Sequence, residues 1–198
     1  MRIAVLAVQG AFTEHEQILR SLGADCTELR KSSDLVGTFD GIVLPGGEST
    51  VQGRLLRELG MFEILQEKIL HGLPVLATCA GLILLAEQLS GSETPWFATL
   101  PVTVRRNAYG RQLGSFSASG TVRGIREEER EFPMEFIRAP YIVSIRKGAE
   151  PIAVTDRLPD GSPGENIVGV RYKNQIGLAF HPELAGDKRC HEMFLSVC

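Results

Sequence analysis

The sequence predicts an α/β fold in three layers: an open, mostly parallel sheet with helices on both faces and an antiparallel hairpin extension. In the first half of the chain, short apolar runs rich in β-branched residues alternate with helical patterns. Such alternation is typical of a parallel sheet that helices cover on both faces. From residue 100 onward, short strands are instead separated by turn residues, which is typical of antiparallel hairpins.

The first half supplies the expected parallel strands and the helices between them. The runs 42–44 and 75–77 are apolar without alternation, so we expect both to be central strands, buried on both faces. The expected strands are Ile3–Val8, Asp25–Leu29, Gly41–Leu44 and Pro74–Thr78, and the expected helices are Thr13–Leu22, Val51–Leu70 and Gly81–Leu89.

The second half begins with the hairpin extension and then returns to the sheet. Turn residues divide the segment 100–122 into short strands, and we expect these to form antiparallel hairpins attached to the sheet. The charged run 127–131 and the Pro- and Gly-rich run 158–165 are expected to be exposed loops. Two strands, Ile167–Tyr172 and Ile176–Phe180, and a helix from about Asp187 to Val197 follow.

The composition favours a single globular domain spanning residues 1–198. The chain is 43% hydrophobic and 23% charged, which is enough for one well-buried core. Its net charge is −3 and its basic residues are scattered, so nucleic acid is not an expected partner. The longest uncharged stretch, Leu73–Ala86, is shorter than the ~20 residues that span a bilayer, so no membrane association is expected.

Neither a metal nor another cofactor is expected. The four cysteines, Cys26, Cys79, Cys190 and Cys198, lie far apart without C-x-x-C spacing, so neither a zinc site nor a disulfide framework is indicated. The apolar start Ile3–Val8 lacks a basic lead-in and a cleavage pattern, which favours a first strand over a signal peptide. We therefore expect the protein in the reducing cytosol.

Cys79 stands between a buried strand and an apolar helix. It directly follows the expected strand Pro74–Thr78 and precedes Ala80-Gly81, a strand, turn and helix arrangement typical of a nucleophile elbow. Such a turn lifts the side chain above the carboxyl edge of the sheet, where open α/β folds place their sites. A buried structural cysteine is the alternative, and this feature alone does not decide between the two.

A base and a carboxylate occur together in His181-Pro182-Glu183. They follow the expected strand Ile176–Phe180, so they can reach the same sheet edge as Cys79. We expect Pro182 to hold the chain extended, Glu183 to accept the Nδ1 proton of His181, and Nε2 to point to the sulfur. A strand-end histidine with a solvated glutamate is the alternative.

A third candidate is the loop Pro45-Gly46-Gly47-Glu48-Ser49-Thr50, between an expected strand and a helix that Ser49 or Thr50 could cap. Two glycines permit positive φ and expose backbone N–H groups, so the turn can aim an amide at the oxyanion of a tetrahedral intermediate. An ordinary loop before a helix is the alternative for this segment taken alone.

Together these motifs resemble a family, the glutaminase subunits of pyridoxal 5′-phosphate synthase within the class I (triad) glutamine amidotransferases. The resemblance covers essentially the whole chain. It rests on the segments Val8–Ala11 with Glu14-His15, Leu44–Thr50, Thr78–Leu82, Arg106-Asn107 with Gly110-Arg111-Gln112, Phe136–Pro140 and Phe180–Leu184. The family usually has Gly two residues before the nucleophile, where this chain has Ala77.

The resemblance implies that Cys79 attacks the carboxamide of L-glutamine and that His181, oriented by Glu183, passes the proton to departing ammonia. Water then hydrolyses a glutamyl thioester to glutamate. The loop contacts to the oxyanion fall to Gly46, Gly47 and Ala80, and the family contacts its partner and this loop near Gln9 and Gly10. By resemblance, the substrate-binding residues are Gly47, Glu48, Ser49, Arg106, Ile137 and Arg138.

Released ammonia needs an acceptor, and we expect a partner to supply the acceptor site. By resemblance the partner is a (β/α)₈-barrel synthase subunit that combines ammonia with ribose 5-phosphate and glyceraldehyde 3-phosphate. The family assembles twelve glutaminases around a dodecameric synthase core, and docking switches the glutaminase on.

Two alternatives stay open on the sequence. One is the glutaminase subunit of another amidotransferase, such as imidazole glycerol phosphate synthase; the segments GGEST and FIRAP argue against it. The other is a non-catalytic binding module on the same fold; the joint presence of Cys79, His181 and Glu183 argues against that.

Overall fold

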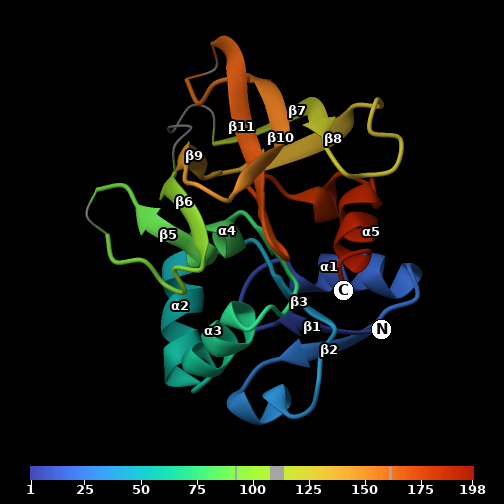
Figure 1. Ribbon diagram of the computed structural model, residues 1–198, viewed down its shortest axis with the longest axis vertical. Helices are drawn as coiled ribbons and strands as arrows, with labels where there is room; N and C mark the ends of the chain where they lie inside the picture. The colour runs from blue at the N-terminus through green and yellow to red at the C-terminus, as the bar shows by residue number, and fades with distance from the viewer. Residues whose placement is uncertain (92, 108–113, 161) are drawn as a thin grey trace.

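The computed structural model describes residues 1–91, 93–107, 114–160 and 162–198 (Figure 1). Its α-helices are α1 Phe12–Ser21, α2 Ser49–Glu58, α3 Phe62–Leu70, α4 Ala80–Leu85 and α5 Arg189–Leu195, with 3₁₀ turns η1 Ser32–Leu35 and η2 Pro182–Leu184. Its strands are β1 Arg2–Leu6, β2 Asp25–Leu29, β3 Gly41–Leu44, β4 Val75–Thr78, β5 Ala86–Leu89, β6 Leu100–Arg105, β7 Ser115–Val122, β8 Phe132–Ile137, β9 Tyr141–Ile145, β10 Glu150–Arg157, β11 Pro163–Tyr172 and β12 Gln175–Leu178.

Within the described ranges, the main sheet has nine strands in the order β2-β1-β3-β4-β12-β11-β10-β7-β8. The strands from β2 to β12 pair in parallel, and those from β12 to β8 pair antiparallel. The predicted α/β class is confirmed, with a parallel half that continues into an antiparallel extension. Strands β3, β4 and β12 are buried at every position, as expected for central strands.

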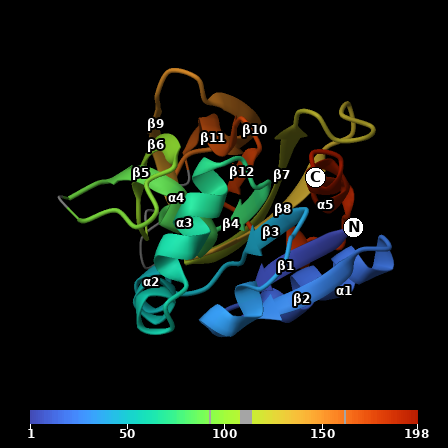
Figure 2. The same ribbon diagram turned by 60° about the horizontal axis from the view of Figure 1, so that its bottom comes forward.

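Helices cover both faces of the parallel half and make the outer two layers. Helices α1 and α5 lie on one side of these strands and α2, α3 and α4 on the other (Figure 1), an arrangement that the rotated view also shows (Figure 2). The core between the layers is built from large apolar side chains with almost no exposed surface, among them Leu6, Leu19, Ile42, Leu56 and Phe180.

The extension differs in one respect from the expected hairpins of residues 100–122. Strands β6 and β7 do not pair with each other; β6 joins a separate three-stranded sheet, β5-β6-β9, whereas β7 pairs with β8 and β10 in the main sheet. The pairing is decided by partners distant in sequence, which local turn residues do not identify. Of those turn residues, Gly110 lies outside the described residues, as do Arg111 and Gln112.

Two predicted helices were wrong in extent. The helix expected over Val51–Leu70 is broken into α2 and α3 at Gly60, whose φ of +65° stops the first helix. The helix expected over Gly81–Leu89 ends at Leu85, and residues 86–89 form β5, which pairs in parallel with β6.

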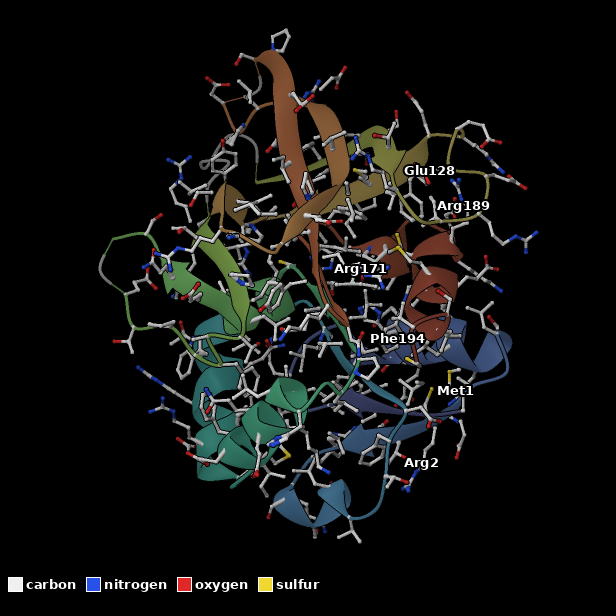
Figure 3. All side chains as sticks on the ribbon, in the orientation of Figure 1. Met1, Arg2, Glu128, Arg171, Arg189 and Phe194 are labelled. Carbon is white, nitrogen blue, oxygen red and sulfur yellow. The ribbon has the colours of Figure 1, made fainter. Side chains whose placement is uncertain are left out.

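The loop at 123–131 is tied to α5 through one arginine. Arg189 is 8% exposed, and its guanidinium donates to the carbonyl oxygens of Glu127, Arg130 and Glu131 at 3.0–3.1 Å. Asp187 accepts from the same guanidinium at 2.7 Å. Figure 3 shows Arg189 at the end of α5, below the loop that carries Glu128. The side chains of residues 127–131 are exposed, as predicted, while Ile125 is buried and the backbone of the loop is held by Arg189 of the helix.

Candidate active site

Cys79 sits at a strained turn between β4 and α4. Its backbone has φ 47° and ψ −100°, a conformation that a residue with a β-carbon adopts only where the surroundings enforce it. The surroundings include Gly81, where a β-carbon would overlap the carbonyl oxygen of Leu44, so α4 packs directly against the end of β3. The turn has the geometry of a nucleophile elbow, and Ala77 does not prevent it.

His181 and Glu183 lie at the end of the neighbouring strand. β12 pairs in parallel with β4, with Leu178 opposite Thr78, so the segments that follow both strands meet at one sheet edge. His181 Nδ1 lies 2.7 Å from Oε1 of Glu183. The expectation that Pro182 holds the chain extended was wrong: residues 182–184 form a 3₁₀ turn, and this turn brings the two side chains together.

The His181 ring is buried between Glu183 and Cys79. Burial alone lowers the pKa of His181, but its interactions with Cys79 and Glu183 outweigh burial and raise the pKa to about 10. Its second nitrogen, Nε2, is buried and meets no hydrogen-bond partner in good geometry, whereas the Cys79 thiol contacts the carbonyl oxygen of Ile137 at 3.8 Å. The ring therefore lies close enough to Cys79 for its pKa to respond, without a hydrogen bond of good geometry at Nε2.

The loop Pro45–Thr50 is fastened to the segment after β1. The Ala11 amide donates to the carbonyl oxygen of Gly46 at 3.1 Å, and the Glu48 amide donates to Oε1 of Gln9 at 2.8 Å. A β-carbon on Gly10 would overlap the Gly46 carbonyl, so Gly10 permits this contact. The predicted cap is absent: Ser49 is the first residue of α2, and its N-cap Glu48 makes no side-chain capping bond.

These segments surround a pocket of about 190 Å³. The pocket brings together nearly every residue that the sequence singled out, while Glu183 and Ala80 lie behind it, next to lining residues. Among the lining residues are Gln9, Gly10, Gly46, Gly47, Glu48, Ser49, Cys79, Arg106, Ile137, Arg138 and His181. Four further residues, Ala11, Ile83, Asn107 and Leu184, also line the pocket. None of them was predicted as a site residue, although Ala11, Asn107 and Leu184 belong to segments on which the resemblance rests.

The two arginines at the pocket are both ion-paired. Arg138 lies 2.9 Å from Glu48, and both side chains are substantially exposed. Arg106 lies 2.8 Å from Glu93. A substrate carboxylate that binds either guanidinium must therefore compete with a carboxylate of the protein, which is a modest cost for exposed pairs.

A second set of polar groups lies behind the triad and was not predicted as part of the site. His15 on α1 and His191 on α5 are fully buried. His15 Nδ1 lies 2.9 Å from His191 Nε2, and His15 Nε2 lies 3.3 Å from Oε2 of Glu183. The composition alone could have drawn attention to this cluster. The chain has only four histidines, and three of them, His15, His181 and His191, lie around Glu183.

Over the described ranges, no group of three or more His, Cys, Asp or Glu side chains is arranged to hold a metal ion. No helix in those ranges is long and apolar enough to cross a membrane. The pocket presents the thiol of Cys79, the imidazole of His181 and backbone amides, and the carboxylate of Glu183 lies next to the imidazole.

Comparison with known proteins agrees with this geometry. The model of the family described as "SNO glutamine amidotransferase family" matches residues 5–198 of the chain. The chain belongs to this family of glutamine amidotransferases. One relative is pyridoxal 5′-phosphate synthase subunit PdxT of Desulfitobacterium hafniense strain Y51. It is 60% identical to this chain over 195 residues, which cover 98% of this chain and 92% of that protein.

Two further similarities support the assignment to the family. The PdxT subunit of Bifidobacterium longum strain NCC 2705 is 47% identical, with 98% of both chains covered. A crystal structure described as a glutamine amidotransferase superposes with a TM-score of 0.86 at 38% identity and covers 98% of this chain and 97% of that one. The fold is therefore that of a glutamine amidotransferase.

Proposed function

We propose that this chain is the glutaminase subunit of a pyridoxal 5′-phosphate synthase. It hydrolyses L-glutamine to L-glutamate and ammonia and passes the ammonia to a synthase subunit. The observation that carries the proposal is the convergence of Cys79, His181 and Glu183 at one pocket in a chain of the amidotransferase family. The relatives are named as subunits of pyridoxal 5′-phosphate synthase, which supports this synthase as the acceptor of the ammonia.

The first half-reaction forms a thioester. The Cys79 thiol passes its proton to His181 as the sulfur attacks the carboxamide carbon, and the carbon–nitrogen bond breaks as His181 delivers that proton to the departing ammonia. The raised pKa of His181 keeps that proton on the ring until the tetrahedral intermediate needs it. Glu183 fixes the ring through Nδ1 and stabilises the imidazolium.

The second half-reaction releases glutamate. His181 takes a proton from a water molecule, the water oxygen bonds to the carbonyl carbon, and the carbon–sulfur bond breaks. The Cys79 thiol is regenerated, so the cycle consumes one water and releases one ammonia and one glutamate.

The developing oxyanion needs backbone donors. We assign this role to the amides of Gly47 and Ala80, with Gly46 as the flexible neighbour; Ala80 begins α4, so its N–H lacks an intrahelical acceptor. One such donor contributes roughly 3 kcal/mol of barrier reduction. In the structure the Gly46 carbonyl oxygen accepts from the Ala11 amide, and we propose rotation of the Gly46-Gly47 peptide as the activating step.

The amino acid end of glutamine is assigned to the rim of the pocket. Gly47, Glu48, Ser49 and the Ile137-Arg138 pair all line it together with Arg106. An arginine suits the α-carboxylate because a guanidinium binds it bidentately, and Glu48 suits the α-amino group by charge.

The partner is proposed to be a (β/α)₈-barrel synthase subunit in an assembly of twelve plus twelve chains. Gln9 and Gly10 contact the pocket loop, so docking there is mechanically linked to that loop. Ile137 and Leu184 expose 39% and 43% of their surface beside the pocket, which supports contact with another protein at this rim. The cytosol is the proposed compartment, supported by four free thiols.

A glutaminase subunit that feeds another amidotransferase, such as imidazole glycerol phosphate synthase, would share this chemistry. One experiment separates the two. The chain is mixed with the candidate barrel subunit, glutamine, ribose 5-phosphate and glyceraldehyde 3-phosphate, and pyridoxal 5′-phosphate is measured by its absorbance. The proposal predicts glutamine-dependent product that Cys79→Ala abolishes, while added ammonium salt restores it. Glutaminase activity without any product in the complete mixture would reject the acceptor.

A further inference from the structure

A buried chain of polar side chains continues from the proposed triad into the protein interior. His181 contacts Oε1 of Glu183 at 2.7 Å. On the far side, Nε2 of His15 lies 3.3 Å from Oε2 of Glu183 and 3.2 Å from the Thr78 hydroxyl oxygen. His15 Nδ1 lies 2.9 Å from His191 Nε2. The side chains of His15 and Glu183 are both 0% exposed, so water cannot replace these contacts.

The hydrogen positions follow from the charge of the carboxylate. Burial raises the pKa of Glu183, but its electrostatic interaction with His15 and its hydrogen bond to His181 outweigh burial and lower the pKa overall, so Glu183 is an anion. A bare lone pair on His15 Nε2 would be repelled by Oε2, so Nε2 carries the hydrogen, donates it to the Thr78 hydroxyl oxygen at 3.2 Å and faces Oε2 of Glu183 at 3.3 Å. Nδ1 of His15 is then an acceptor, and His191 Nε2–H donates to it.

The remaining atoms agree with this assignment. His191 Nδ1 is buried without a hydrogen-bond partner, which suits a bare ring nitrogen better than an N–H. Burial lowers the pKa of both His15 and His191, so both rings are neutral. All N–H groups then point the same way, from His191 to His15 to Glu183, and each hydrogen bond polarises the next.

We propose that His15 is a positioning residue for the catalytic carboxylate: its Nε2–H anchors Oε2 of Glu183, and His191 fixes the tautomer of His15. The inference rests on the proposed function, in which Glu183 orients His181. The contact between His15 Nε2 and Oε2 at 3.3 Å lacks the geometry of a good hydrogen bond, so His15 acts on the carboxylate through the electrostatic attraction of its Nε2–H, which keeps Oε1 turned toward His181.

The surroundings of this contact define what a pH profile reports. The ionisable groups that interact with His15 are Glu183, His181, Glu14 and His191, and Cys79 acts on the same cluster through His181. Because His15 helps to keep the pKa of Glu183 low, its removal makes Glu183 easier to protonate. The acid limb of the glutaminase profile should therefore move to higher pH.

The test uses the complex with the synthase subunit and measures ammonia release from glutamine against pH. His15→Leu removes the donor and keeps an apolar volume, and His15→Gln retains an N–H near the position of Nε2. We expect His15→Leu to lower kcat about 10- to 100-fold, the equivalent of one hydrogen bond to a charged group, with KM nearly unchanged because His15 does not line the pocket. His15→Gln should recover most of the rate and the normal acid limb. His71→Gln, at an exposed histidine, is the control and should match the wild type.

A double-mutant cycle separates positioning from general structure. If His15 acts through Glu183, His15→Leu should change kcat less than about threefold in a Glu183→Gln background. Equal losses in both backgrounds, or an unshifted acid limb in both His15 variants, would overturn the proposal. Should His15→Leu not fold, His15→Met, which also lacks the N–H donor, carries the same comparison. Turnover by Cys79→Ala would instead reject the proposed function, whereas an inactive Cys79→Ala with additive His15 effects rejects only the role of His15.

Discussion

Gly46 touches the imidazole of His181 so closely that a β-carbon built there would overlap ring atom Cε1. Because the ring is also held by Glu183 at 2.7 Å, it cannot move aside without breaking that hydrogen bond. The close approach to the imidazole of His181 thus requires a glycine at this position.

We predict that Gly46→Ala lowers glutaminase kcat by more than about tenfold, since displacing a general base from its hydrogen bond costs at least this much. Steady-state assays in the synthase complex measure the effect. Gly23→Ala is the control, because no atom lies within 4 Å of its β-carbon position; it carries backbone strain but does not touch the pocket. Equal activity of Gly46→Ala and wild type would contradict the close approach.

The element that positions the nucleophile is α4, which packs against β3 through Gly81. A methyl group at this position pushes the helix away from the carbonyl oxygen of Leu44. We predict that Gly81→Ala destabilises the fold by about 1–3 kcal/mol, the usual cost of overpacking, and lowers activity because the Cys79 turn moves with the helix. Urea unfolding followed by fluorescence gives the first quantity. A Gly81→Ala variant as stable and as active as the wild type would contradict the close contact between α4 and the carbonyl oxygen of Leu44.

Arg189 gives a second prediction at the level of elements. Its guanidinium joins α5 to three carbonyl oxygens of the 123–131 loop and to Asp187. Arg189→Met keeps the apolar stem but leaves these acceptors and Asp187 without their donor, so we expect a loss of about 3–5 kcal/mol in the free energy of unfolding. Arg171→Met, at a partly exposed residue whose side chain donates to the carbonyl oxygen of Lys173, should change the free energy of unfolding by less than about 1 kcal/mol. Similar losses in both variants would refute the role of Arg189.

The sequence predicted those elements whose causes are local. Apolar runs without alternation located β3 and β4, and small residues around Cys79 indicated the elbow. The break at Gly60 and the strand β5 were missed, because an apolar helical pattern runs through both and the outcome depends on pairing with β6. The His15–His191 contact joins residues 176 positions apart, so no spacing in the sequence indicates it. The roles of the site residues remain predictions that the experiments above test.

At the scale of the whole molecule, the buried histidines make folding stability depend on pH. Burial lowers the pKa of His191 to about 3 and also lowers that of His15. In the unfolded chain a histidine titrates near ~6.5, so the unfolded state binds more protons below that pH, and stability falls as the pH decreases. His181 has the opposite effect. Its pKa is raised to about 10, so its contribution to stability is complete at low pH and is lost only as the pH rises above ~6.5.

We therefore predict that the free energy of unfolding falls between about pH 6.5 and pH 4.5, with a slope of up to ~1.4 kcal/mol per pH unit for each neutral ring. Urea titrations across this range measure it. His191→Leu should reduce the slope by about one ring's share, while the exposed His71→Leu should leave it unchanged. A flat wild-type profile would mean that His15 and His191 are protonated in the folded protein.

Covalent trapping tests whether the sulfur of Cys79, at the edge of the sheet, attacks glutamine. The complex with the synthase subunit is treated with a diazo ketone analogue of glutamine and digested for mass spectrometry. We expect a single adduct on Cys79 and none on the buried Cys26 and Cys190. The adduct should be absent in Cys79→Ala and should form more slowly in His181→Ala. An unmodified Cys79 in a complex that releases ammonia from glutamine would contradict the account.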